Sequence, residues 1–385
     1  MIDLHAHVVP ADVVGRAGAW GPEAGERSDG TPWFRVGGYE LVGVRYEGTA
    51  FMDPDVRLAG MDAAGITVQV LSPNPITYLH NVPAPVADEF CRWHNDTMAA
   101  LVARHPTRLA GFAQLPVQDP ALAATELARA VGEAGLVGGY IGTEMPHDLD
   151  DPAMDELWAA AVELDVPVVV HPAPHGIDGA PADPRLRRWD LDLSLGFAYE
   201  ETIAVAQLVL GGVLDRHPAL DVAVSHGGGA TPWLLERLRR TAASRPGVPD
   251  ALRAPGAVDD RLARLWWDAH VGGPDALAVL ASTFGTDHLL PGTNFAGWDS
   301  PRRGDAGAMA AGPVAPGGHG GQGGPNSPGG PGGPVAAIVS SPGPPGTNGP
   351  GGPTGPAAIT GAGELSGLSD RLDANARRFL RERLP

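Results

Sequence analysis

The stretch MIDLHAHV, residues 1–8, sets the pattern for the whole chain. Its apolar residues are typical of a buried β-strand, and the strand ends in two histidines separated by one residue. Side chains at positions i and i+2 of a strand point to the same face, so His5 and His7 present two imidazoles side by side. Such a pair makes half of a metal site, although it also occurs as merely polar residues of a hairpin strand.

Short apolar segments of the same kind recur along the chain, separated mostly by segments with helical periodicity. This alternation indicates a parallel sheet that is buried on both faces. Eight such strands predict an α/β fold, a (β/α)8 TIM barrel. An open doubly wound sheet is the alternative, but no glycine-rich phosphate loop follows the first strand. The predicted strands are residues 1–8, 66–71, 109–115, 136–141, 166–171, 220–226, 262–270 and 288–295, and residues 39–46 are expected in a small hairpin.

Polar side chains stand at the carboxyl ends of several predicted strands. His171 ends the fifth strand, His226 ends the sixth, and Asn294 lies on the eighth. Active sites of TIM barrels lie at this end of the strands, so we expect these residues to meet His5 and His7 around one centre. A lone histidine at a strand end is usually a satisfied polar residue, but four at the same end of one barrel indicate a metal site.

The composition bears on the partners of the chain. Its 385 residues include 27 Lys and Arg against 45 Asp and Glu, a formal net charge of −18. This charge argues against nucleic acid or an anionic membrane surface and favours a small-molecule ligand. We see no leader sequence and no apolar run long enough for a bilayer, so we expect a cytoplasmic protein. The single cysteine, Cys91, is expected to be a buried thiol in a helix.

Several motifs in combination resemble the amidohydrolase superfamily. They are HAH at residues 5–7, the segment 57–72, HP at 171–172, SHGGG at 225–229 and GTN at 292–294. The chain is most similar to the branch that contains aminocarboxymuconate semialdehyde decarboxylase and related aromatic-acid decarboxylases. The resemblance implies one divalent metal, Zn²⁺ or Mn²⁺, with His5, His7 and His171 as ligands. It implies that His226 is the general acid/base.

One position departs from the family's pattern. The family has an aspartate at the end of the eighth strand, as metal ligand and proton acceptor, where this chain has Asn294. An amide oxygen can coordinate a metal, but it brings no negative charge and accepts no proton. We place Asn294 among the metal ligands and catalytic residues, and expect Asn294→Asp to tighten metal retention. Asp287 lies before the strand, at the other side of the barrel, whereas Asp299 could reach the site from the following loop.

The substrate-binding residues follow from the chemistry of a carboxylate, which calls for an arginine fork. The resemblance indicates Arg245, which would reach a neighbouring subunit's site and so implies a homodimer, and also Arg45. Both can equally be surface arginines. Trp298, with Trp189 and Phe197, is expected to form a wall for a flat ring.

The end of the chain has a different composition. Residues 304–363 are dominated by Gly and Pro without the strict three-residue period of collagen, which predicts a disordered insertion. Residues 364–385 contain an amphipathic helix that is expected to pack back on the barrel of residues 1–303.

These features favour a metal-dependent decarboxylase, a carbon–carbon lyase of a small unsaturated or aromatic carboxylic acid. A hydrolase of an amide, ester or lactone is the alternative. Asn294 weakens it, because hydrolysis needs a base beside the attacking water. A metal-poor, non-catalytic relative is the third possibility.

Overall fold

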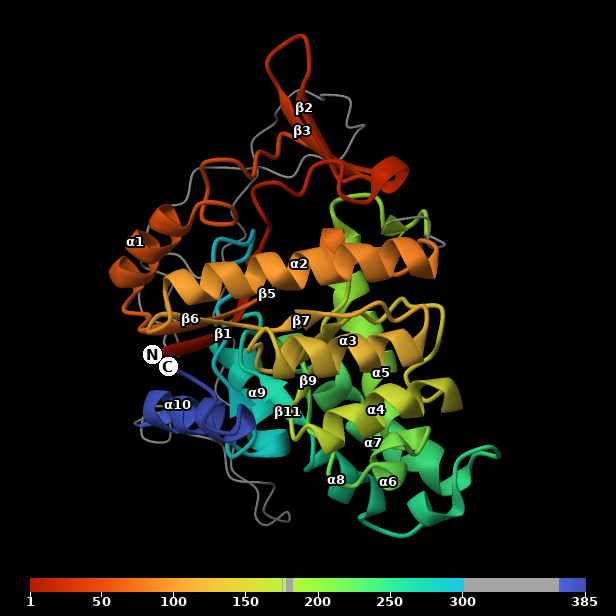
Figure 1. Ribbon diagram of the computed structural model, residues 1–385. Coiled ribbons are helices and arrows are strands. Elements are labelled where there is room, and N and C mark those ends of the chain that lie inside the picture. Colours follow the sequence, from red (N-terminus) through yellow and green to blue (C-terminus); the bar gives the residue numbers. More distant parts are fainter. Residues whose placement is uncertain (175, 178–182, 301–366) are drawn as a thin grey trace, which may run out of the picture.

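The computed structural model describes residues 1–174, 176–177, 183–300 and 367–385. Parallel strands form a closed barrel with helices outside it, as predicted (Figure 1). The predicted third strand is broken at Phe112 into two short pieces. The barrel strands are β1 (Ile2–Val8), β5 (Val68–Pro73), β6 (Leu109–Gly111), β7 (Ala113–Gln114), β8 (Gly139–Ile141), β9 (Val168–Val170), β10 (Val222–Val224), β11 (Trp266–Asp268) and β12 (Leu289–Leu290).

Two backbone hydrogen bonds close the barrel. The ladders run in the orders β1-β5-β6 and β12-β11-β10-β9-β8-β7. The N–H of Phe112 donates to the carbonyl of Leu71 at 2.8 Å, and the N–H of Leu4 donates to the carbonyl of Pro291 at 2.9 Å. The first bond joins β5 to the residue between β6 and β7, and the second joins β1 to the residue after β12. The first and eighth strands of the barrel are therefore neighbours.

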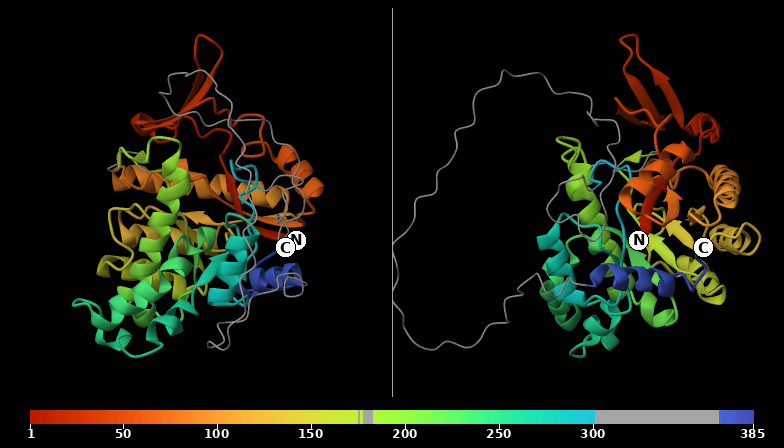
Figure 2. Two further views of the ribbon diagram at one scale, coloured as in Figure 1. Left: turned by 180° about the vertical axis from the view of Figure 1, so that it is seen from behind. Right: turned by 90° about the vertical axis from the view of Figure 1, so that its left-hand side faces the viewer.

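The helices pack around the barrel (Figures 1 and 2). Asp119 caps α3 (Pro120–Gly132), because its carboxylate accepts from two backbone N–H groups of the first turn. The helices are α1 (Pro54–Ala64), α2 (Ala84–Arg104), α3 (Pro120–Gly132), α4 (Asp155–Glu163), α5 (Phe197–Leu210), α6 (Val213–Arg216), α7 (Thr231–Ser244), α8 (Ala257–Leu262), α9 (Pro274–Phe284) and α10 (Leu368–Phe379). Shorter turns are η1 (Gly18–Trp20), η2 (Pro75–Thr77), η3 (Pro152–Met154), η5 (Asp192–Gly196), η6 (Ser225–Gly228) and η7 (Asp250–Leu252).

A small antiparallel sheet projects from the barrel after β1 (Figure 1). It comprises β2 (Glu23–Glu26), β3 (Pro32–Val36) and β4 (Tyr39–Val42), so the hairpin expected at residues 39–46 is confirmed in its first half. The Tyr39 hydroxyl donates to Asp192 of η5 at 3.1 Å. The sheet is thereby tied to the elements on one side of the barrel.

The closing helix α10 packs against the first and last strands, as expected for the end of the chain. The Asn375 amide donates to the carbonyls of Thr286 and Leu289 at 2.9 and 2.8 Å, and Asp373 accepts from the N–H of Ile2 at 2.8 Å. The predicted insertion at 304–363 lies outside the described residues. The proposed division of the chain at 303 and 364 therefore stays a prediction.

Some expectations differ from the structure. The eighth strand was expected over residues 288–295, but β12 is shorter and Asn294 lies beyond its end. The seventh strand was expected from Leu262, but α8 extends to that residue and the strand begins at Trp266, because Leu262 is a buried core residue on a helix. Within the described ranges, the helical stretch Asp192–Leu210 is long and apolar enough to cross a bilayer, whereas the sequence was expected to contain no such segment. One such stretch is weak evidence for a membrane span, because core helices of soluble proteins can pass the same test of length and composition.

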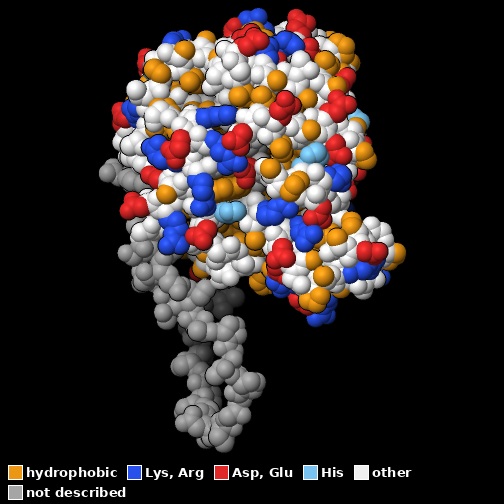
Figure 3. All heavy atoms as spheres, turned by 60° about the horizontal axis from the view of Figure 1, so that its bottom comes forward, with side chains coloured by type: hydrophobic (Ala, Val, Ile, Leu, Met, Phe, Trp, Pro, Cys, Tyr) orange, Lys and Arg blue, Asp and Glu red, His pale blue; other side chains and the backbone are white. Residues whose placement is uncertain are grey.

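The buried thiol agrees with the sequence analysis. Cys91 is buried in α2. On the face shown in Figure 3, Arg side chains are interspersed with Asp and Glu.

Candidate metal centre and active site

Three histidines from two strand ends meet inside the mouth of the barrel. Their ring centroids lie 5.1 Å apart for His5 and His7, 5.0 Å for His5 and His171, and 4.8 Å for His7 and His171. All three side chains are buried, and one nitrogen atom of each lies within 4.8 Å of those of the other two. The structure therefore brings the three predicted ligands together.

Hydrogen bonds fix which nitrogen of each ring faces the centre. The Nδ1 of His7 lies 3.1 Å from the carbonyl of Pro73, and the Nδ1 of His171 lies 2.7 Å from the carbonyl of Pro172. A carbonyl can only accept, so each Nδ1 carries a proton and each Nε2 has a free lone pair. The Nε2 atoms of His5 and His171 are buried and have no hydrogen-bond partner among the described residues.

Burial lowers the pKa of all three imidazoles, and mutual repulsion adds to this for His7 and His171. Neutral imidazoles with anchored Nδ1 atoms and converging, unpartnered Nε2 atoms are what a divalent metal requires. The residues present therefore fit a metal ion.

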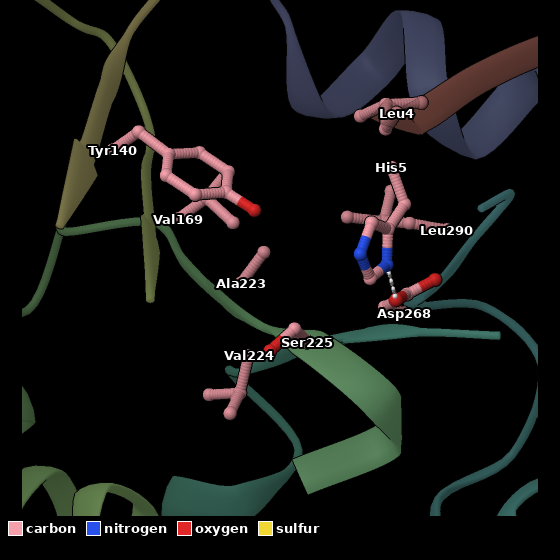
Figure 4. A pocket seen from close by; sticks show the side chains of 9 residues that line it. All are labelled: Leu4, His5, Tyr140, Val169, Ala223, Val224, Ser225, Asp268 and Leu290. Atoms are coloured by element: carbon pink, nitrogen blue, oxygen red, sulfur yellow. Dashed lines mark hydrogen bonds and ion pairs between the residues drawn. The ribbon is translucent and has the colours of Figure 1, made fainter. Parts of the chain in front are cut away.

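The sequence analysis overlooked Asp268, which ends β11 and holds His5 in place (Figure 4). Its Oδ2 lies 2.7 Å from the Nδ1 of His5 and accepts from the backbone N–H of His226 at 3.2 Å, and its Oδ1 accepts from the N–H of His270 at 2.9 Å. Burial raises the pKa of this carboxyl, but the neighbouring His5 outweighs burial and the pKa is lowered. A carboxylate at the end of the seventh predicted strand was the signal that could have identified it.

A small cavity lies beside His5, among Tyr140, Ser225 and Asp268 (Figure 4). Its volume is ≈ 20 Å³, which is enough for one water molecule.

The fourth predicted histidine lies next to the three ligands. The ring of His226 is 4.9 Å from that of His5 and 5.0 Å from that of His171. Its Nδ1 lies 2.6 Å from Oε1 of Glu201, a buried residue of α5 that also accepts from Ser225 at 2.5 Å. Burial lowers the pKa of His226, but the attraction and hydrogen bond of Glu201 outweigh burial and raise it to about 9.

The glycines after His226 explain how the turn reaches this helix. Gly229 has φ +63°, and a Cβ atom there would lie 2.2 Å from the carbonyl oxygen of Ala198. Only glycine permits η6 to approach α5 so closely. The SHGGG motif thus brings His226 to Glu201.

Asn294 lies just after β12 with its side chain turned to the following loop. Its Nδ2 donates to Oδ1 of Asp299 at 2.5 Å, and Oδ2 of Asp299 lies 3.0 Å from Nε2 of His270. Asp299 is therefore in the site, as the alternative in the sequence analysis allowed. The role of Asn294 as a metal ligand stays a prediction, and His270, which the motifs did not mark, is part of the site.

A cavity of ≈ 450 Å³ opens in front of His226, and this volume suits a ligand with a single ring. Trp298 and Phe197 form part of its wall, as predicted, whereas Trp189 is not among the lining residues. No Lys or Arg side chain lines it among the described residues. Its lining comprises Leu193, Ser194, Phe197, Ala198, Glu201, His226, Gly227, Gly229, Pro232, Trp233, His270, Val271, Gly272, Ala276, Val279, Leu280, Trp298 and Asp299.

The structure does not bring the two predicted arginines to this cavity. Arg45 forms an ion pair with Glu26 at 2.7 Å beside the small sheet, where both side chains are half exposed. Arg245 follows α7 in an exposed position. Within one chain, neither guanidinium lines the cavity, and their role in binding a carboxylate stays a prediction.

The comparisons with known proteins match this geometry. A family model described as "Amidohydrolase" matches residues 2–317. The chain belongs to the amidohydrolase family. This result confirms the resemblance in the sequence, and the (β/α)8 barrel is the fold expected for its relatives.

Two relatives and two solved structures illustrate the similarity. The chain is 27% identical over 305 residues to 2-amino-3-carboxymuconate-6-semialdehyde decarboxylase of Dictyostelium discoideum, covering 76% of this chain and 81% of that protein. It is 34% identical over 194 residues to gamma-resorcylate decarboxylase of a Polaromonas species, covering 48% and 58%.

A crystal structure of dihydroxybenzoic acid decarboxylase from Polaromonas, with bound manganese and 2-nitroresorcinol, superposes with a TM-score of 0.59. It is 25% identical and covers 77% of this chain and 86% of that one. A 2,6-dihydroxybenzoate decarboxylase in complex with 2,6-dihydroxybenzoate superposes with a TM-score of 0.61, also at 25% identity, covering 77% and 88%.

Replacing Asn294 by aspartate is expected to tighten metal retention. The new carboxylate would lie beside Asp299, whose Oδ1 is 2.5 Å from Nδ2 of Asn294. A nearby cation relieves the repulsion between two carboxylates. Metal content after dialysis against a chelator, measured by mass spectrometry, tests this. Thr125→Asp places the same charge on the outside of α3 and is expected to leave retention unchanged. Equal retention in both variants would mean that position 294 does not sense the ion.

Proposed function

We propose that this protein is a metal-dependent decarboxylase of a small aromatic or unsaturated carboxylic acid. The observation that carries the proposal is the pairing of His226 with the buried Glu201 directly beside three converging neutral imidazoles. A charged imidazolium next to a Lewis-acid site provides both elements that decarboxylation needs, a proton donor and a stabiliser of negative charge. The names of the relatives support the same chemistry.

The roles of the residues follow from their positions. His5, His7 and His171 would hold the cation, which when bound would attract the substrate's oxygen atoms and stabilise the negative charge that develops as the carboxyl group leaves. His226 delivers a proton to the carbon that loses CO₂, so that one C–C bond breaks and one C–H bond forms. Glu201 keeps His226 charged and oriented. Phe197 and Trp298 confine the ring beside this donor.

The metal in this proposal is Zn²⁺, with Mn²⁺ as the alternative. Three imidazole nitrogen atoms favour zinc, whereas a Polaromonas relative has bound manganese. Metal-free protein reloaded with each ion separately, and assayed for CO₂ release, distinguishes them.

The reaction itself is tested by incubating the protein with a panel of aromatic and unsaturated acids and measuring CO₂. Release of CO₂ with one proton from solvent incorporated at the vacated carbon supports the proposal. Entry of ¹⁸O from water into the product without loss of carbon would instead show a hydrolase and contradict it.

We also propose that the active unit is a homodimer. Large hydrophobic side chains are exposed on the elements around the cavity, which is the usual sign of a protein interface. They are Trp189, Leu195, Tyr199, Trp233, Val279 and Trp298. The cavity has no arginine of its own among the described residues, so a partner that contributes Arg245 would complete the carboxylate site.

Replacing Trp233 by lysine is expected to convert the dimer to a monomer, because Trp233 is 83% exposed and a charge there opposes burial in an interface. Light scattering after size-exclusion chromatography measures the mass. Val56→Lys changes an exposed apolar side chain of α1 and is expected to leave the mass unchanged. A monomeric wild-type protein would refute the dimer.

A further inference from the structure

The loop after β12 places a carboxylate in the cavity wall. Asp299 lines the cavity, and one of its oxygen atoms belongs to a group, with nitrogen atoms of His226 and His270, whose members lie within 4.8 Å of one another. Asn294 donates to Oδ1, and His270 lies at hydrogen-bond distance from Oδ2. One partner on each oxygen fixes the plane of the carboxylate, while each oxygen keeps a further lone pair for a ligand.

The other charged groups of the cavity do not neutralise the negative charge of Asp299. Glu201 is already compensated by His226, with a contact of 2.6 Å. No lysine or arginine is among the described lining residues, and much of the wall is apolar, including Phe197 and Leu280. Within one chain, a second negative charge on the ligand at this position would face Asp299 with no lining arginine to offset it, whereas a hydroxyl or amino group would find an acceptor.

We propose that Asp299 is a specificity-determining residue. It accepts a hydrogen bond from a hydroxyl or amino group of a monocarboxylic substrate, and it excludes acids with a second carboxylate near that position. This inference rests on the proposed function, in which the substrate's own carboxylate is held at the metal centre. Asn294 and His270 are positioning residues that aim the Asp299 carboxylate into the cavity.

The proposal explains why the strand-end amide and the loop carboxylate occur together. An aspartate at 294 would repel Asp299, whereas the amide of Asn294 donates to it. With an amide in place of an aspartate at position 294, the residue at the strand end donates a hydrogen bond to the carboxylate of Asp299 in the next loop.

The specificity that Asp299 confers can be tested without turnover, by measuring how three probes bind to the metal-loaded full chain. The probes are benzoate, 2-hydroxybenzoate and phthalate, and stopped-flow tryptophan fluorescence, with Trp298 in the cavity wall, follows binding before any reaction. We expect 2-hydroxybenzoate to bind about tenfold tighter than benzoate, the effect of one hydrogen bond to a charged group, and phthalate at least about tenfold weaker.

Asp299→Asn is expected to bring all three affinities to within about threefold of one another, because it removes the charge and keeps the shape. Asp287→Asn removes an exposed carboxylate before β12 and is expected to change none of them. His270→Gln keeps a donor toward Asp299 and should preserve the preference for 2-hydroxybenzoate, whereas His270→Leu should reduce it. This second pair gives an answer even if Asp299→Asn does not fold.

Two results would overturn the inference. The first is an unchanged order of affinities in Asp299→Asn or in His270→Leu. The second is two metal equivalents per wild-type chain with one lost in His270→Leu, which would make His226, His270 and Asp299 a second metal site. CO₂ release by the wild-type protein together with an unchanged order of affinities in Asp299→Asn would refute this inference alone. The expected binding pattern without any CO₂ release would refute the proposed function alone.

Discussion

Replacing His171 by alanine is expected to remove the bound metal and to lower the rate of CO₂ release by more than about a hundredfold, which is the upper effect of changing residues that only support ligands. His171 is one of three converging imidazoles, and its Nε2 is buried without a partner among the described residues. Two remaining nitrogen ligands leave a divalent ion too weakly held to survive purification. Metal content per chain and CO₂ release, measured on the same sample, test this.

The thermal midpoint provides a second measurement. Metal binding to the folded wild-type protein stabilises it by about 2.7 kcal/mol at a free metal concentration one hundred times the Kd, so added metal should raise its melting temperature. The same addition should have no effect on His171→Ala. His147→Ala removes a surface histidine that pairs with Asp151 and is expected to retain both metal and activity. Full metal content in His171→Ala would show that the centre lies elsewhere.

Replacing His226 by glutamine is expected to lower CO₂ release by about 10²–10⁴-fold, the usual contribution of a general acid, while metal content stays at the wild-type level. The amide fills similar space but carries no transferable proton. Glu201→Gln should act in the same direction with a smaller loss, because His226 keeps its position but loses the carboxylate that holds its charge. Loss of metal in His226→Gln would instead make His226 a ligand.

The pH dependence has a defined sign. Because Glu201 raises the pKa of His226 to about 9, the acid form and the ion pair are fully present below the ordinary value of 6.5 and are lost as pH rises through about 9. A bound cation repels the imidazolium, so the alkaline limb of the activity profile in the loaded enzyme should lie at or below this value. The limb should disappear in His226→Gln. An identical limb in that variant would assign the titration to another group.

Several parts of the site could be predicted because they are local to the sequence. The HAH pair shares a face through the two-residue repeat of a strand. His171 directly follows β9, and His226 lies in the η6 turn that follows β10. The position of each along its own strand is enough to place it at the barrel mouth. Asp268 follows the same rule, because it ends β11.

Other contacts of the site could not be predicted from the sequence. The pairing of Glu201 with His226 depends on how closely η6 approaches α5, and the pairing of Asn294 with Asp299 depends on the path of a loop. Arg45 was assigned by resemblance, but local packing gives it Glu26 as a partner. Such contacts join side chains whose distance is set by packing rather than by sequence separation.

By itself the sequence determined the alternation of strands and helices, the barrel that follows from it, and the end of the barrel at which the histidines gather. Periodicity and strand polarity fix these features, since both are properties of the backbone. Only the tertiary structure decided which nitrogen of His5, His7 and His171 faces the centre, and where the carboxylates of Asp268 and Asp299 lie. Those features depend on hydrogen bonds between elements that meet only when the barrel closes.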